Sequence, residues 1–291
     1  MKFNDRRPFV PIVKRPKLVW PNGARLAIWV VPNIEHFEAE SLHGATIATP
    51  ATEPPDVPNY NWRDYGMRVG VWRTMETLRK HDIKGTVALN SRVCALYPEV
   101  IEACTSLGWE FMGHGRTNSE TISGMSEADQ RTMIPDVLET IARATGKRPR
   151  GWLGSALAET DVTLDVLAEH GVEYVSDWVN DEQPYPLQTD TKPVVAMPYT
   201  LEMNDIGTFL RRGFTGPQYA EMMIDQFDVL YDEARHTGKV MCIALHPFIT
   251  GAPFRAKHLD AALSYMREKK HAWFTTGSEI LDAYRVATKT T

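Results

Sequence analysis

The stretch "ARLAIWVVPN" (24–33) is the segment from which the fold is predicted. It is a nearly continuous apolar run that ends at the polar residue Asn33. Strands of parallel sheets have this composition because both of their faces are buried, whereas strands with one face in water alternate between apolar and polar residues. The stretch therefore predicts a doubly buried strand.

Short strand patterns and helical patterns alternate on the C-terminal side of this stretch. Strand patterns are expected at 85–90, 109–115, 148–154, 172–178, 193–200, 239–247 and 272–276, and helical patterns at 70–81, 92–108, 126–146, 160–171, 216–238, 256–270 and 277–286. Such alternation is typical of strand–helix units that wind around one sheet. We expect the α/β class and a closed or nearly closed (β/α) barrel of about seven strands.

The expected domain organisation is a single domain over residues 1–291. It carries an N-terminal arm (1–20) and a long irregular loop (36–68), for which a lid and a subunit contact are both open interpretations. No compositional break and no internal repeat divides the chain.

Composition and charge exclude several classes of function. The net charge of -5 and the pI near 6.0 provide no basic surface for nucleic acid or anionic lipid. The polar, proline-rich start and the lack of a long apolar run predict no membrane segment and a cytoplasmic protein. Three widely spaced cysteines predict neither a disulfide framework nor a thiolate zinc site.

Polar residues follow the expected strands directly, which is difficult to explain by core packing. Because active sites of (β/α) barrels lie at the C-terminal ends of the strands, these residues are candidates for chemistry: Asn33, Glu35, Asn90, His114, Asn118, Trp152, Asp177, Asp181, Glu202, Asn204, Asp205 and His246. The other histidines fall in loop or helix patterns and are expected to be ordinary: His36, His43, His81, His170, His236, His258 and His271.

Six motifs in order give the chain a resemblance to a known family: "VPNIEHF", "GHGRTNSE", "RPRGW", "SDWVNDEQPY", "MPYTLEMND" and "IALHPFITGAPFR". The chain resembles the polysaccharide deacetylase superfamily of NodB-like enzymes, from about Pro21 to the last helix. It looks most similar to the branch of cofactor-independent allantoinase and bacterial cyclic imide hydrolases. The resemblance implies a distorted (β/α) barrel, hydrolysis of a bond between nitrogen and a carbonyl carbon, and a homo-oligomer, commonly a tetramer.

The chain departs from the metal-dependent deacetylases at two positions. Asn33 stands where the resemblance expects an aspartate base, and Asn118 stands where it expects a second histidine; Glu35 and His114 match the remaining ligand positions. Zinc prefers imidazole or thiolate to an amide oxygen. Two alternatives stay open: no cofactor is required, or Glu35, His114 and Asn118 hold a divalent metal weakly, with zinc as the first candidate.

The predicted function is hydrolytic opening of a small cyclic amide, an imide or ureide such as succinimide, maleimide, hydantoin or allantoin. Glu35 is the candidate base or metal ligand, His246 the candidate acid for the departing nitrogen, and His114 the metal ligand or the donor to the oxyanion. Candidate substrate-binding residues are Asn33, Trp152, Asp177, Glu202 and Asn204.

Two other functions are considered. A metal-dependent carbohydrate N- or O-deacetylase requires a competent metal site, and Asn33 and Asn118 disfavour one. A catalytically inactive carbohydrate-binding protein tolerates both residues, but it gives no reason for Glu35, His114 and His246 to follow three separate strands.

Overall fold

The computed structural model describes residues 3–42 and 44–289. His43, which the sequence predicts to be ordinary, lies outside these residues. Within them nine strands form one sheet: β1 Leu26–Ile34, β2 Thr86–Leu89, β3 Glu110–Gly113, β4 Gly151–Trp152, β5 Tyr174–Val175, β6 Tyr185–Leu187, β7 Val194–Ala196, β8 Lys239–Leu245 and β9 Ala272–Phe274.

The sheet is almost entirely parallel and curls into a partial barrel. The strand order is β6-β7-β5-β4-β3-β2-β1-β8, with β9 also paired to β1, and only β6 and β7 pair in the antiparallel direction. The predicted distorted (β/α) barrel is therefore confirmed. Nine strands replace the expected number of about seven: all eight expected strand segments are present, and the short edge strand β6, "YPL", is added to them. The sequence did not predict β6, because Pro186 is compatible with a strand only at an edge or a bulge.

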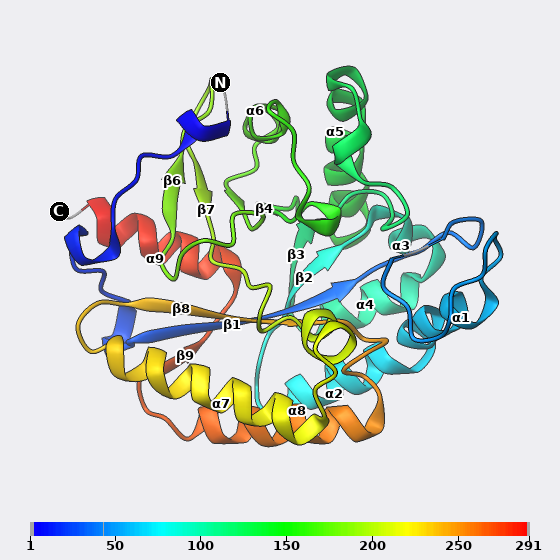
Figure 1. Ribbon diagram of the computed structural model, residues 1–291. Coiled ribbons are helices and arrows are strands. Elements are labelled where there is room, and N and C mark those ends of the chain that lie inside the picture. Colours follow the sequence, from blue (N-terminus) through cyan, green and yellow to red (C-terminus); the bar gives the residue numbers. More distant parts are fainter. Residues whose placement is uncertain (1–2, 43, 290–291) are drawn as a thin grey trace.

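Strand β1 pairs with three other strands, more than any other strand of the described sheet (Figure 1). It is buried along its whole length, as the apolar run predicts. One edge of β1 pairs with β8 from Leu26 to Pro32, and its other edge is shared by β9 near the start and β2 near the end. The long pairing places the C-terminal ends of β1 and β8 side by side.

Most of the helices cover the outside of the curled sheet, and the last one packs against its inside. Their bounds are α1 Val57–Tyr65, α2 Val71–Lys80, α3 Ser91–Leu96, α4 Pro98–Ser106, α5 Glu127–Thr145, α6 Thr163–Glu169, α7 Gly216–Glu233, α8 Pro253–Arg267 and α9 Gly277–Lys289. The helix expected over 92–108 is two helices, because Pro98 lacks an N–H and begins a new helix. Ser126 caps α5 as expected, accepting a hydrogen bond from the backbone N–H of Asp129.

Buried side chains of β1 point alternately to two hydrophobic clusters. Ile28 and Val30 face the helices, whereas Trp29 and Val31 face the inside of the curled sheet. The inner cluster includes side chains of α9, among them Ile280, so apolar packing fills the interior on that side. The polar residues that follow the strands lie at the C-terminal strand ends.

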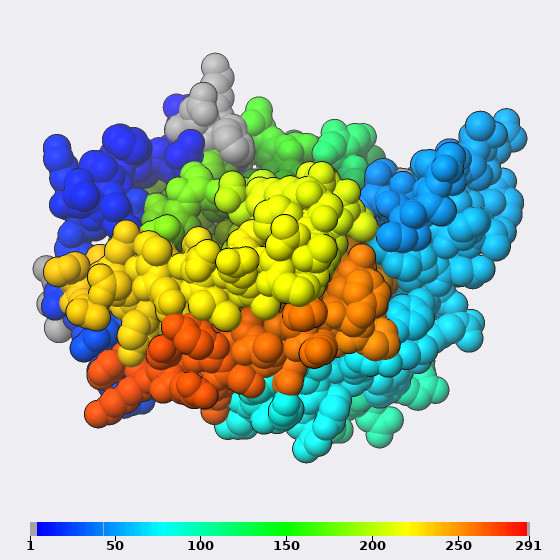
Figure 2. Space-filling model, turned by 60° about the horizontal axis from the view of Figure 1, so that its bottom comes forward, coloured from blue at the N-terminus to red at the C-terminus, as the bar shows by residue number. Residues whose placement is uncertain are grey.

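The segment 36–68 is more regular than the sequence predicts. Its last part forms α1, which a π-helical turn at Gly66–Gly70 joins to α2. Figure 2 shows this part of the chain, coloured blue to cyan, projecting at one edge of the molecule. Among the described residues, no helix is long and apolar enough to cross a membrane.

Candidate active site

The structure brings the three predicted catalytic residues together. Glu35 follows β1, His114 follows β3 and His246 follows β8. Glu35 Oε1 lies 3.2 Å from His114 Nε2 and 3.5 Å from His246 Nε2. All three side chains are buried. Parallel strands of one curled sheet end at the same edge, so residues far apart in the sequence meet there.

A backbone carbonyl orients His114. The Nδ1 atom of His114 lies 2.6 Å from the carbonyl oxygen of Leu153, which directly follows β4. A carbonyl oxygen only accepts hydrogen bonds, so Nδ1 is the donor and Nε2 faces Glu35. The backbone N–H of His114 donates to the carbonyl of Leu89, the last residue of β2. The histidine is thus fixed by both neighbouring strands.

A carboxylate orients His246. The Nδ1 atom of His246 donates to Asp205 Oδ1 at 2.6 Å, and the backbone N–H of His246 donates to Asp205 Oδ2 at 2.7 Å. The hydroxyl of Thr250 donates to the same carboxylate. Asp205 is among the polar residues expected after the strands, but the sequence gives no signal that it contacts His246, 41 positions away.

Glu35 and His246 form a buried ion pair. Burial by itself raises the pKa of Glu35, but the adjacent His246 and His114 lower it to about 2. Burial opposes the charge on His246, yet the carboxylates of Glu35 and Asp205 raise its pKa to about 10. Near neutral pH the carboxylate and the imidazolium are therefore both charged.

The Glu35 cavity is a small space of about 10 Å³ lined by Glu35, His36, Phe37, Tyr60, Arg63, Asp64, Met67 and Tyr97. Glu35 Oε2 is buried and has no hydrogen-bond partner in residues 3–42 and 44–289. The other lining residues come from segment 36–68 and the start of α4, so this segment forms a wall over the carboxylate. Sequence reasoning did not identify Arg63, because no strand precedes it.

Asn118 is placed differently from a metal ligand. Its carbonyl oxygen Oδ1 accepts hydrogen bonds from Asn90 Nδ2 at 3.1 Å and from Ser155 Oγ at 2.9 Å. Glu35 and His114 then remain as two of the three expected ligands, whereas catalytic zinc sites use three protein ligands. Within the described chain, no group of three His, Cys, Asp or Glu side chains has a metal-binding arrangement. The residues present do not fit a resident divalent metal.

Two of the predicted substrate-binding residues hold the strand ends together. The amide nitrogen of Asn33 donates to the carbonyls of Val31 and Leu245 and to the hydroxyl of Tyr199. Asn204 donates to the same hydroxyl. Asn33 lies two residues before Glu35 and Asn204 directly precedes Asp205, so both stabilise the backbone that carries the site.

Three other predicted substrate-binding residues do not line the Glu35 cavity. Trp152 is fully buried against Gly113 and Leu138 of α5, so its ring is part of the core rather than an aromatic wall. Glu202 is exposed. Asp177 accepts a hydrogen bond from the backbone N–H of Gly154 at 2.7 Å and neighbours a second carboxyl group.

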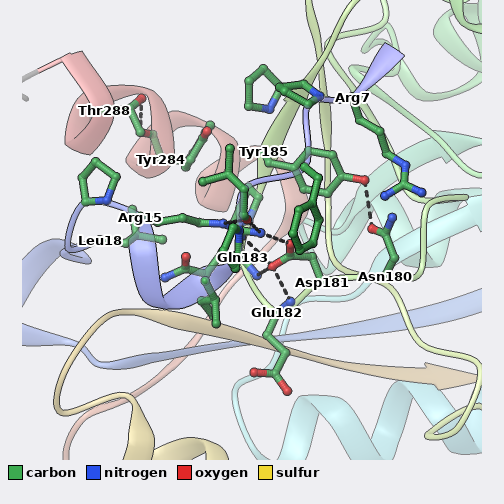
Figure 3. Close-up of a pocket in the computed structure, with 18 of the residues that line it drawn as sticks. Arg7, Arg15, Leu18, Asn180, Asp181, Glu182, Gln183, Tyr185, Tyr284 and Thr288 are labelled. Carbon is green, nitrogen blue, oxygen red and sulfur yellow. Dashed lines mark hydrogen bonds and ion pairs between the residues drawn. The ribbon is translucent and has the colours of Figure 1, made fainter. Parts of the chain in front are cut away.

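A larger cavity, about 920 Å³, lies beneath the N-terminal arm (Figure 3). Asp181, another of the polar residues expected after the strands, pairs there with Arg15 of the arm. Among the described residues, this cavity and the Glu35 cavity share no lining residue. The arm therefore accounts for the position of Asp181, which is separate from the catalytic cluster.

Comparisons with known proteins find similar sequences and structures. The family model "Polysaccharide deacetylase" matches residues 63–175, a span that contains His114. A Schizosaccharomyces pombe protein named "Putative polysaccharide deacetylase" is 28% identical, over 91% of this chain and 92% of its own length. The chain is therefore similar to the polysaccharide deacetylase superfamily.

Two other similar proteins carry different names. The crystal structure of Puue allantoinase is 28% identical, covers 96% of this chain and 96% of its own, and superimposes with a TM-score of 0.87. The peptidoglycan deacetylase of Helicobacter pylori is 21% identical over 74% of this chain and 84% of its own length. The chain is thus similar both to a protein named allantoinase and to proteins named deacetylases.

Proposed function

We propose that this protein hydrolyses a carbon–nitrogen bond in a small cyclic amide, an imide or a ureide. The observation that carries the proposal is the buried cluster of Glu35, His114 and His246 beneath the wall formed by segment 36–68. An enclosed site suits a small ring, whereas a polymer requires a groove open at both ends. The similarity to Puue allantoinase along nearly the whole chain supports the same class.

The proposed reaction uses the chain's own residues. Glu35 Oε2 is the oxygen without a hydrogen-bond partner in the described chain. It accepts a proton from a water molecule while the oxygen of that water attacks the ring carbonyl carbon. His114 Nε2 lies 3.2 Å from Glu35 Oε1 and restricts the position of the carboxylate. His246, charged near neutral pH and oriented by Asp205, donates its Nε2 proton to the ring nitrogen as the carbon–nitrogen bond breaks.

We propose that no resident metal takes part in this reaction. The support is the donor set: the oxygen of Asn118 already accepts two hydrogen bonds, and Asn33 supplies no carboxylate. Activated ring carbonyls in imides and ureides place a smaller demand on the nucleophile than an unactivated acetamide does.

The second candidate function is carbohydrate deacetylation. The matched family model and the name of the Helicobacter pylori relative favour it. It demands the hydrolysis of an acetamide on a long substrate, and the wall over Glu35 opposes access of such a substrate.

One set of assays separates the two functions. Purified protein is incubated with succinimide, maleimide, hydantoin and allantoin, and separately with chitin oligomers, each with and without EDTA. We expect the wild-type protein to open at least one ring at a rate that EDTA does not change. In Glu35→Gln, which keeps the shape of the side chain but removes the base, the rate of ring opening should fall by at least 100-fold. Acetate release from chitin oligomers that EDTA abolishes, without opening of any ring, would refute the proposal.

A further inference from the structure

Arg63 on α1 is a buried cation with an unusual set of contacts. Its side chain is 5% exposed, and its guanidinium carbon lies 4.5 Å from the centre of the Phe37 ring and 5.9 Å from that of Phe248. The two Nη atoms donate to the carbonyl oxygens of Asn59 and Ala45. Its Nε atom is buried and, within residues 3–42 and 44–289, has no hydrogen-bond partner.

The charge of Arg63 lacks a contacting carboxylate in the described part of the chain, where its hydrogen bonds go to backbone carbonyls. Burial lowers the pKa of Arg63, while the negative charges of Glu35 and Asp56 raise it. A buried cation without a paired anion is costly. An anionic group of a ligand that reached Arg63 would supply the missing partner.

The position of Arg63 indicates which part of a ligand it meets. Arg63 and Glu35 line the same cavity. In the proposed reaction, the oxygen of water adds to the ring carbonyl carbon, the carbon–nitrogen bond breaks, and the nitrogen takes a proton from His246. Glu35 returns the proton taken from water to the now neutral His246, and the new carboxylic acid releases its own proton to solvent, so a carboxylate forms beside the Glu35 carboxylate. Two adjacent carboxylates repel each other unless a cation lies close to them.

We propose that Arg63 binds the carboxylate that ring opening creates, so that the site recognises the ring-opened acid as well as the ring. This inference rests on the proposed function and adds a residue on the wall segment to its binding site. Guanidinium N–H groups suit the planar geometry of a carboxylate, and the surrounding aromatic faces keep water from screening the interaction. The cavity has room for about one water molecule, so entry of a ligand requires the wall to move.

The test compares two ligands that differ in charge at one end. Isothermal titration calorimetry measures the binding of succinamate, the ring-opened form of succinimide, and of the neutral succinamide. We expect the wild-type protein to bind succinamate about 10- to 100-fold more tightly, the gain typical of a hydrogen bond to a charged group. In Arg63→Gln the difference should fall to less than about threefold, and in Arg63→Lys, which keeps the charge, part of it should remain.

Two further variants control the interpretation. Arg68→Gln removes a cation that is 75% exposed and close to Arg63 in sequence, and it should leave the preference unchanged. Glu35→Gln removes the repelling carboxylate and should strengthen succinamate binding. Thermal melts followed by circular dichroism establish whether each variant is folded. If Arg63→Gln does not fold, the ligand preference of Arg63→Lys is compared with that of the wild type instead.

Failure of this inference is distinguishable from failure of the proposed function, because the titrations require no turnover. A folded Arg63→Gln that keeps the full preference for succinamate, or a wild-type protein without such a preference, would overturn the inference even where a ring is opened. Arg63-dependent binding by a wild-type protein that opens no ring would support the carboxylate site and refute the hydrolytic proposal.

Discussion

At the scale of single residues, the side chains of the candidate site differ in their hydrogen-bond partners, and these partners give each side chain a different role. Glu35 contacts two imidazoles, and each imidazole is held from behind by a different group: a backbone carbonyl for His114 and the carboxylate of Asp205 for His246. A negative group on the far side of His246 keeps it protonated and fixes its orientation. Asp205 therefore acts on the reaction through His246.

Asp205→Asn tests this positioning role. We expect kcat for ring opening to fall by about 10²- to 10⁴-fold with little change in KM, because proton donation matters only as the bond breaks. Activity of the wild type should decline at alkaline pH as His246, with a pKa of about 10, loses its proton. Removing the carboxylate should move this decline to lower pH, measurable as a pH–rate profile.

Asp225→Asn, which changes an exposed carboxylate on α7, is the matched control and should leave both kcat and the pH profile unchanged. If the activity of Asp205→Asn declined at the same alkaline pH as that of the wild type, Asp205 would not set the protonation of His246.

At the scale of elements, the segments after β4 and β5 form a second polar unit beside the catalytic cluster. Trp178 Nε1 donates to both carboxylate oxygens of Glu159 at 3.2 Å, and Asp177 neighbours the same carboxyl group. Burial raises the pKa of Glu159 to about 7, and burial together with the charge of Glu159 raises the pKa of Asp177. The unit therefore retains protons at pH values at which ordinary carboxyl groups have lost theirs.

The sign of the resulting pH dependence follows from proton binding. Between the ordinary pKa of a glutamate, about 4.5, and about 7, the folded state binds more protons than the unfolded chain, so the free energy of unfolding falls as pH rises. We expect urea denaturation to show a decrease of roughly 1 to 3 kcal/mol between pH 5 and pH 8, since one pKa unit corresponds to about 1.4 kcal/mol.

Glu159→Gln keeps an acceptor for Trp178 and should reduce this decrease to less than half. The neighbouring Asp161→Asn changes an exposed carboxylate and should leave it as in the wild type. Equal pH dependence in the wild type and Glu159→Gln would assign the protons to another group.

At the scale of the whole molecule, the N-terminal arm is attached to the outside of the barrel by buried ion pairs. Arg6 binds Asp165 of α6 through two hydrogen bonds of 3.1 and 2.6 Å, and its side chain is 1% exposed. The backbone N–H of Gln188 donates to the Arg6 carbonyl. Residues 180–186, which reach into the edge strand β6, line the cavity beneath the arm, as Figure 3 shows for Gln183 and Tyr185.

Arg6→Ala leaves the carboxylate of Asp165 buried without its cation. We expect the free energy of unfolding to fall by about 3 kcal/mol, the scale found when one partner of a buried ion pair is removed. Chemical denaturation measures this change. Lys17→Ala, at an exposed position of the same arm, should alter it by less than about 0.5 kcal/mol; equal effects of the two variants would show that the Arg6 pair does not anchor the arm.

Assembly and cellular location stay predictions at this scale. The arm exposes Phe9 and Val13, which is compatible with the homo-oligomer expected from the resemblance. The single domain over 1–291 and the cytoplasmic location are likewise untested expectations.

Sequence patterns predicted the features that depend on neighbouring residues. The apolar run at 24–33 predicted β1, the Ser126 cap predicted the start of α5, and the positions after strands selected Glu35, His114 and His246. Each of these is a local property: strand burial, helix capping and the place where a strand ends are written in a few consecutive residues.

The tertiary structure alone decided which side chains meet. Trp152 belongs to a two-residue strand, too short for an alternating pattern to show which face it occupies. The oxygen of Asn118 is engaged by Asn90 and Ser155, and Arg63 reaches the Glu35 cavity from a segment that precedes no strand. These contacts join residues that are distant in sequence, so they depend on the curl of the sheet and the path of the covering segment, which no local pattern specifies.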